Sequence, residues 1–274
     1  MPSSNPAFGR GFANAGNGGQ YPGWGAQPQQ YGAPTRYGAP VQSDPYAAPS
    51  PYAPPTTRYM TMDDVVTKTG VTFLVTVLTA AAVWAMPGQA AWGLAIPAML
   101  VGLVLGLVIA FKQIANPAAT LAYAAVEGVF LGAISEAFNT FYPGIVMQAV
   151  IGTFGVFAGM LVVYKTGAIR VTPKFTRWMM GALVGVLVLM LANMLAGFFG
   201  VNLGLRDGGP IAIIFSLVVI GVAAFSLLLD FDMADEAIRR GAPAKFAWYI
   251  AFGLLVTVVW LYLEILRLLS YFRE

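Results

Sequence analysis

Hydrophobic and polar residues follow two different patterns, which meet at about residue 60. Before this point they show no helical or strand period. After it, seven runs of roughly 20 mostly apolar residues alternate with short breaks of proline, glycine and charged residues. An α-helix of that length crosses the ~30 Å hydrocarbon core of a lipid bilayer. The pattern therefore predicts an all-α integral membrane domain with seven spanning helices.

Turn residues between the apolar runs set the boundaries of the predicted helices. The helices are expected at 66–86, 91–111, 118–138, 145–164, 178–199, 211–229 and 246–272. Pro-Gly, Asn-Pro and Gly-Gly-Pro sequences lie in the breaks, and these residues favour turns over continued helix. Residues 61–274 are thus predicted to form one seven-helix transmembrane domain.

Residues 1–60 have a composition that does not support a packed core. They hold 11 of the 18 prolines, and their one acidic residue is Asp44. Such a segment cannot bury enough apolar surface to offset its ordering entropy. A short Tyr- and Pro-containing unit recurs at 31–34, 37–40, 46–49 and 52–55. We expect a disordered, Pro/Gly/Tyr-rich cytoplasmic tail, which is either a plain extension or a docking segment for a membrane protein partner.

Charged residues make up only 10% of the 274-residue chain, against about 25% in soluble globular proteins. The sequence contains no histidine and no cysteine. Their absence excludes Ser-His and Cys-His nucleophile pairs, zinc sites built from these residues, and haem or iron–sulfur ligation. We therefore expect a membrane protein that is not an enzyme and has no cofactor.

The Lys and Arg residues indicate the orientation of the helices. If the N-terminus is cytoplasmic, 12 of the 15 lie on the cytoplasmic side, and Arg206, Arg267 and Arg273 lie outside. Cytoplasmic loops of membrane proteins carry such an excess. We predict a multi-pass protein of the cell membrane with a cytoplasmic N-terminus. Because the basic residues are scattered between apolar runs, no nucleic-acid partner is expected.

Small residues four apart occur in four of the predicted helices. The pairs are Gly102 and Gly106, Gly128 and Gly132, Gly155 and Gly159, and Gly181 and Gly185. Such pairs allow two helix backbones to approach closely in lipid. We expect a tight bundle.

Five acidic residues are expected within or at the ends of the helices, where a charge costs at least about 2.5 kcal/mol and often marks an ion pathway. They are Glu127, Glu136, Asp230, Asp232 and Glu264. Glu127 lies midway along the third helix and is either a structural carboxylate or an ion ligand. Asp230 and Asp232 are expected at the cytoplasmic edge of the membrane, facing different ways. Glu264 pairs either with Arg267, one turn on, or with a group on another helix.

Carboxylates are the remaining candidates for pH sensing in a chain without histidine. Two carboxylates that meet in a low-dielectric bundle cannot both ionise cheaply, so such a pair responds to pH as a unit. Carboxylate oxygens are also the preferred ligands of Ca²⁺.

Three segments resemble the Bax inhibitor-1-like family, also called transmembrane Bax inhibitor motif proteins, of bacterial type. They are 124–135, 225–238 with its Asp-Phe-Asp sequence, and 260–268. The resemblance covers about residues 60–274. It implies a bundle in which six helices surround a central seventh, and a function as a passive, pH-sensitive Ca²⁺ leak.

The resemblance also implies roles for individual residues. Asp232 and Glu264 correspond to an aspartate pair that senses pH and binds Ca²⁺, with Asp230 beside them, although this chain has Glu at the second position. Lys112 corresponds to a basic latch that bonds Asp232. Glu127 stands in for an acid that bacterial members can carry in the second helix. Because 32 residues separate Asp232 from Glu264, they meet only if part of the connection between the last two helices lies at the membrane surface.

Two functions follow from these observations. The first is a passive Ca²⁺ leak channel gated by protonation of the carboxylate pair, with Ca²⁺ and protons as its ions. The alternative is a non-conducting regulatory or scaffold protein of the membrane. In that case the carboxylates are structural, and the tail binds a partner such as a membrane protease or stress-response component.

Overall fold

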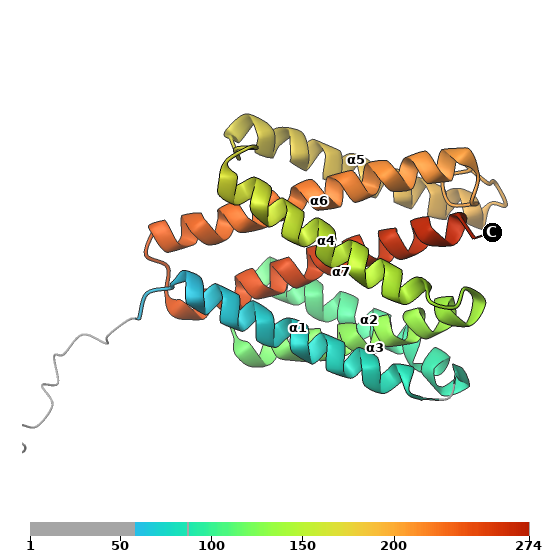
Figure 1. Cartoon of the computed structure of the whole chain (residues 1–274), viewed down its shortest axis with the longest axis horizontal. Coiled ribbons are helices and arrows are strands. Elements are labelled where there is room, and N and C mark those ends of the chain that lie inside the picture. The colour runs from blue at the N-terminus through green and yellow to red at the C-terminus, as the bar shows by residue number, and fades with distance from the viewer. Residues whose placement is uncertain (1–57, 87, 274) are drawn as a thin grey trace, which may run out of the picture. The chain divides into compact units, whose positions relative to one another are not determined.

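The computed structural model of the chain describes residues 58–86 and 88–273, and the described part is helical (Figure 1). Seven helices in it are long and apolar enough to cross a membrane, as the sequence predicts. They are α1 (Met62–Trp84), α2 (Gly88–Lys112), α3 (Pro117–Phe141), α4 (Ile145–Thr166), α5 (Pro173–Phe198), α6 (Pro210–Arg239) and α7 (Ala247–Tyr271). A 3-10 turn, Ala244–Phe246, precedes α7. The tail predicted over residues 1–60 lies outside the described residues, except for residues 58–60.

Helix α6 departs most from its predicted bounds, because it continues ten residues beyond 229 to Arg239. Ion pairs one turn apart support this polar extension. Arg239 lies 3.4 Å from Asp235 and Arg240 lies 2.6 Å from Glu236, and the residues of each pair are four apart in the sequence. Hydropathy alone misses such an extension, since it ends a helix where the apolar run ends.

Capping residues fix where several helices begin. Thr61 and Asp64 form a capping box at the start of α1, in which each side chain accepts a hydrogen bond from the backbone N–H of the other. Asn116 and Thr172 cap α3 and α5 with side-chain oxygens, and a proline follows each cap at the first helical position. These local signals give the turns of the bundle definite positions.

Helix α7 is the central helix of the described domain, as the family resemblance implies. It packs against α1, α3, α4 and α6 (Figure 1), and about two thirds of the residues in its apolar 18-residue stretch are buried. Helix α5 lies at the periphery and packs mainly on α6. The six other helices therefore do not contact α7 equally.

Glycines bring α1 and α3 into close contact. A Cβ atom at Gly128 would collide with Thr79 and with the Thr76 carbonyl, and one at Gly132 would collide with the Ala80 carbonyl. These two positions therefore require glycine, as expected for a small-residue pair in lipid.

The other three glycine pairs differ among themselves. A Cβ at Gly102 or Gly106 would contact α3 at 3.1 Å, so this pair also brings two helices together. The pairs on α4 and α5 have no atom within 4 Å of a Cβ in the described part of the chain. The prediction that all four pairs pack helices is therefore wrong for α4 and α5.

Residues 58–60 are fastened to the connection between α6 and α7. Tyr59 forms an isolated antiparallel bridge with Pro243. The Met60 N–H donates to the Ala242 carbonyl and the Ala244 N–H donates to the Arg58 carbonyl, both at 2.8 Å. The predicted tail therefore ends before Arg58.

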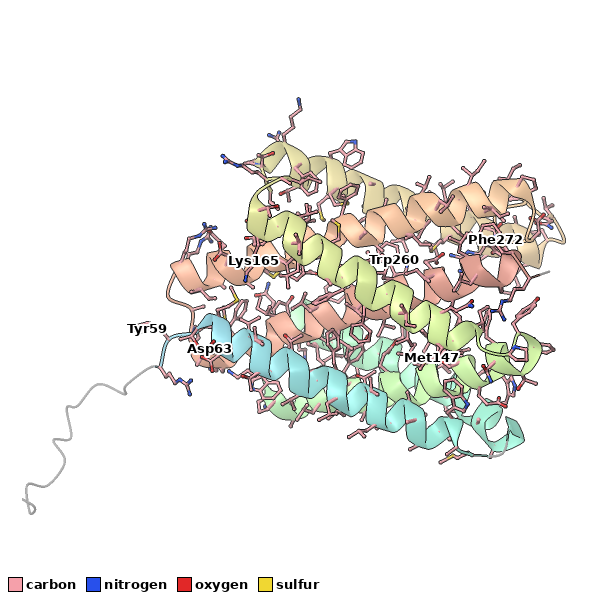
Figure 2. The ribbon with its side chains drawn as sticks, in the orientation of Figure 1. Tyr59, Asp63, Met147, Lys165, Trp260 and Phe272 are labelled. Atoms are coloured by element: carbon pink, nitrogen blue, oxygen red, sulfur yellow. The ribbon has the colours of Figure 1, made fainter. Side chains whose placement is uncertain are left out.

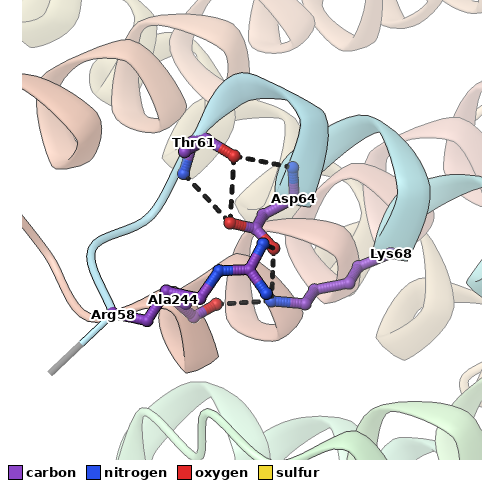
Figure 3. A network of polar contacts seen from close by, with 5 residues as sticks. All are labelled: Arg58, Thr61, Asp64, Lys68 and Ala244. Atoms are coloured by element: carbon purple, nitrogen blue, oxygen red, sulfur yellow. Dashed lines mark hydrogen bonds and ion pairs between the residues drawn. The ribbon is translucent and has the colours of Figure 1, made fainter. Parts of the chain in front are cut away.

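Asp64 and Lys68 reinforce this fastening (Figure 3). The Asp64 carboxylate lies 3.2 Å from Arg58 and 3.5 Å from Lys68. The Lys68 ammonium donates to the Ala244 carbonyl at 2.5 Å and lies 5.8 Å from the centre of the Trp248 ring. Together these contacts join the start of α1 to the 3-10 turn at Ala244 and to the first turn of α7.

Candidate functional site

A cavity of about 500 Å³ lies between α2, α3, α6 and α7. Most of its lining is apolar, and four side chains bring polar atoms to it: Tyr123, Glu127, Asp230 and Thr257. The lining comes from two helix pairs, α2 with α3 and α6 with α7, that are distant from each other in sequence, so the cavity is a product of the tertiary fold.

Asp230 belongs to this cavity and lies deep within the domain. It faces Thr257, which by the 1.5 Å rise per residue lies about 15 Å from the start of α7 and about 21 Å from its end. The sequence predicts Asp230 at the membrane edge, and this is wrong because α6 continues nine residues beyond it. The carboxylate is therefore near the middle of the membrane-spanning domain.

The Asp230 carboxylate is held by α7. The Thr257 hydroxyl lies 2.6 Å from Asp230 Oδ2 and 3.2 Å from the carbonyl oxygen of Gly253. A Cβ at Gly253 would lie 3.9 Å from Asp230 Oδ1, an ordinary van der Waals contact, so the carboxylate lies beside this glycine. Gly253 and Thr257, one turn apart, thus form one surface of α7 that accommodates Asp230.

Glu127 enters the same cavity from α3. A Cβ at Gly102 of α2 would lie 3.1 Å from Glu127 Oε2, so the carboxylate packs directly against α2 at a glycine. Tyr123, one turn earlier on α3, interacts with Glu127 through its hydroxyl and packs edge-on against Phe252 of α7 at 4.9 Å between ring centres. Glu127 is therefore positioned by neighbours on two helices.

The cavity has an acidic character. Among the residues that line it, two are acidic and none is basic. Carboxylate and hydroxyl oxygens are ligands for hard cations, but Ca²⁺ takes six to eight oxygen ligands when it is tightly held. The described residues contain no group of three or more acidic side chains around one point that could hold a metal ion.

The expected pair of Asp232 and Glu264 does not form. Helices α6 and α7 run antiparallel, and Asp230 is level with Thr257. From this level Asp232 lies toward the α6–α7 connection and Glu264 lies the other way, so the two are about 13 Å apart along the helix axes. Because α7 begins at Ala247 and spans straight through, the connection contains no surface segment long enough to bring them together.

Glu264 instead belongs to an ion cluster at the opposite end of the bundle. Its Oε1 atom lies 3.0 Å from Arg206 in the α5–α6 connection and 3.2 Å from Arg267, which confirms Arg267 as one partner. The residue is only 3% exposed, and its Oε2 atom is buried. Two arginines therefore hold Glu264, and it lies outside the cavity.

Asp232 and Lys112 do not form the expected latch. Lys112 ends α2 with an exposed side chain, and it has no ion pair or hydrogen bond within the described ranges. Asp232 is half-buried and does not line the cavity. Its charged neighbours are Asp235, Glu236 and Arg239 on its own helix. Of the sequence candidates, the structure thus brings together Asp230 and Glu127 only.

Sequence reasoning missed Thr257 and Tyr123. Neither carries a charge, so the search for ionisable residues passed over both. A signal was present for Tyr123, which stands four residues before Glu127 and so faces the same side of α3. No comparable signal joins Thr257 to Asp230, because that contact depends on the register of α6 against α7.

A second cavity, of about 280 Å³, lies between α1, α3, α4 and α7. Its lining contains no charged residue. Ser135 and Tyr262 satisfy each other there with a 2.7 Å hydrogen bond, and Thr76 donates to the Ala124 carbonyl. Because its lining carries no charge, this cavity is less suited to an ion than the first one.

The comparison with known families extends the resemblance seen in the sequence. A family model described as Bax inhibitor 1 like matches residues 5–274, whereas the sequence segments alone indicated only residues 60–274. No curated protein matches the chain. The family match includes all four helices that form the acidic cavity. Because it spans nearly the whole chain, this multi-pass membrane protein belongs to the Bax inhibitor 1 like family.

Proposed function

We propose that this protein is a passive, pH-sensitive leak channel for cations, with Ca²⁺ as its ion. In this proposal the carboxylates of Glu127 and Asp230 attract the cation into the cavity. The cavity between α2, α3, α6 and α7 supports the proposal, because its lining contains two carboxylates and no basic side chain. Glu127 lies near the middle of α3, and Asp230 faces Thr257 near the middle of α7. A charge in the membrane interior is costly and usually marks an ion or proton pathway. The proposal assigns no enzymatic reaction and no cofactor to the protein.

Protonation supplies the pH sensitivity in this proposal. When Glu127 and Asp230 are ionised, their oxygens attract a cation into an otherwise apolar cavity. When they take up protons, the attraction is lost and the cavity becomes a barrier to charge. Flux should therefore fall as the pH falls.

Calcium flux into dye-loaded proteoliposomes tests the proposal. We expect the variants Asp230→Asn and Glu127→Gln each to reduce flux at neutral pH by about tenfold, since each loses about 1.4 kcal/mol or more of cation attraction. The double variant should also lose the response to pH. Asp232→Asn is the matched control, because it removes an acid two residues away that does not line the cavity. It should keep both the flux and its pH response.

Two results would reject this function. One is wild-type protein that gives no flux above empty liposomes at any pH. The other is a double variant that keeps the wild-type flux and pH response. A loss of both in Asp232→Asn alone would transfer the role to Asp232.

The fastening of residues 58–60 to the α6–α7 connection favours a second function. It connects the segment that follows the Tyr- and Pro-containing repeats to the connection that comes after the helix carrying Asp230. We propose as the alternative that the protein regulates a membrane partner bound by residues 1–57. Deletion of residues 1–57 separates the two functions. A variant that conducts normally but no longer captures the partner would support the alternative.

A further inference from the structure

Four basic residues surround the connection between α4 and α5. Lys165 ends α4, Arg170 lies in the connection, and Lys174 and Arg177 lie in the first turns of α5; all four side chains are exposed. Figure 2 shows Lys165 at this end of α4. We call these four residues the α4–α5 basic surface.

The charges of the α4–α5 basic surface are not neutralised by the protein. Within residues 58–86 and 88–273, none of the four lies within ion-pair distance of an acid, and Arg177 donates only to the Pro173 carbonyl. Arg239 and Arg240 on α6, by contrast, pair with Asp235 and Glu236. Unpaired positive charge is therefore concentrated at the α4–α5 connection.

The tail contains too few acidic residues to neutralise this surface. Residues 1–57 contain one acidic residue, Asp44, against the basic residues Arg10 and Arg36. The tail thus cannot neutralise four cations. Any anion that neutralises this surface would therefore come from outside the chain.

The surroundings of the α4–α5 basic surface indicate a lipid partner. Trp178 follows Arg177 directly and is 63% exposed, and tryptophan is enriched where membrane meets water. Further along α5 the exposed residues are apolar, among them Met180, Val184 and Leu187. Basic residues, an aromatic ring and then a hydrocarbon-facing surface follow one another along one helix, in the order of headgroup, interface and acyl chains.

We propose that the α4–α5 basic surface binds anionic phospholipid headgroups. Clusters of Lys and Arg at the end of a spanning helix bind anionic lipids, and each charge contributes about a fivefold increase in affinity. Because α5 packs mainly on α6, this contact also holds the exposed end of α5 at the membrane surface. The proposal does not depend on ion conduction.

A fluorescence titration tests the proposal. The chain has no cysteine, so Ala168→Cys in the α4–α5 connection gives one site for an environment-sensitive dye. Short-chain phosphatidylglycerol is added to the detergent-solubilised, full-length protein, and short-chain phosphatidylcholine serves as the uncharged comparison. We expect tighter binding of phosphatidylglycerol and a loss of about 25-fold in Arg170→Gln/Lys174→Gln, at about fivefold per charge.

The matched control is Arg239→Gln/Arg240→Gln, which removes two cations that are paired with acids. It should bind phosphatidylglycerol as the wild type does. Raising the ionic strength from about 0.01 M to about 0.15 M shortens the screening length from ~30 Å to ~8 Å, so it should weaken binding by the wild type itself.

Four results would overturn the proposal. They are equal binding of both lipids by the wild type, wild-type binding that resists salt, a control variant as weak as the test variant, and binding of inorganic phosphate or an acidic peptide as tight as that of phosphatidylglycerol.

Discussion

The Thr257 hydroxyl on α7 donates a 2.6 Å hydrogen bond to the Asp230 carboxylate on α6. This contact joins the central helix to the neighbour that carries the deepest acid of the candidate site. Because both groups line the same cavity, the hydrogen bond fixes the position of one of its two carboxylates. The family resemblance implies a second acid on the seventh helix, which corresponds to Glu264; at this cavity, however, α7 supplies the hydroxyl of Thr257.

Replacing Thr257 with Val keeps the shape of the side chain and removes the donor. A hydrogen bond to a charged group contributes about 1.5–3 kcal/mol, so we expect Thr257→Val to lower stability by about that amount and to reduce flux. Thr257→Ser keeps the hydroxyl and should retain most of both. Thermal unfolding in detergent and liposome flux measure the two effects. Equal behaviour of the two variants would show that the hydrogen bond has no role.

Arg206 should matter more to stability than Arg267, although both contact Glu264 at similar distances. Arg206 fastens the α5–α6 connection to α7, whereas Arg267 lies one turn away on the same helix, where such pairs contribute only about 0.2–0.5 kcal/mol. Removing one partner of a buried ion pair costs about 3–5 kcal/mol when no other partner remains. Because Arg267 stays in place, we expect Arg206→Gln to cost roughly half of that.

Thermal unfolding of Arg206→Gln and Arg267→Gln in the same detergent compares the two arginines. A larger loss in Arg267→Gln would contradict the expected order. Exchanging the charges in Arg206→Glu/Glu264→Arg should recover part of the loss of either single variant. Recovery would show that the two side chains interact directly.

The seven helices could be predicted from the sequence because bilayer thickness imposes their length and the apolar runs record it. The depth of Asp230 could not, since the apolar run ends at Leu229 while α6 continues on paired charges, including Asp235 with Arg239. The sequence places Asp230 at the edge for this reason. The helix places it inside the bundle.

The sequence also does not show which residues on different helices contact each other. Glu264 has Arg267 three residues away, and that pairing is visible in the sequence. Its second partner, Arg206, is 58 residues away in a connection whose path the sequence does not show. The expected pair with Asp232 relied on family similarity, and the register of α6 against α7 decides against it.

Asp64 is expected to be more important than its neighbour Asp63, although both are acids in the first turn of α1. Asp64 is buried and takes part in the capping box and in ion pairs with Arg58 and Lys68. Asp63 is exposed. Asp64→Ala keeps the N-cap Thr61 but removes the carboxylate half of the capping box and both ion pairs, so we expect it to lower stability by about 1–2 kcal/mol and Asp63→Ala by much less.

Hydrogen exchange locates the effect of Asp64→Ala. The amides of Met60 and Ala244 donate the two hydrogen bonds between the start of α1 and the α6–α7 connection. Both should exchange faster in Asp64→Ala and remain protected in Asp63→Ala. Unchanged protection of both amides in Asp64→Ala would show that the backbone bridge holds without the carboxylate.

Gly132 and Gly155 provide a matched test of helix packing, since both are glycines within spanning helices. A Cβ at Gly132 would collide with the Ala80 carbonyl of α1, and backbone cannot move aside without separating two helices. We expect Gly132→Ala to destabilise the protein by about 1–3 kcal/mol or more, as for overpacked cores. Gly155→Ala meets no atom within 4 Å and should be neutral or slightly stabilising, because alanine favours helix. Thermal unfolding of the two variants compares their stabilities. A similar loss of stability in both would mean that α4 also packs closely against another chain through Gly155.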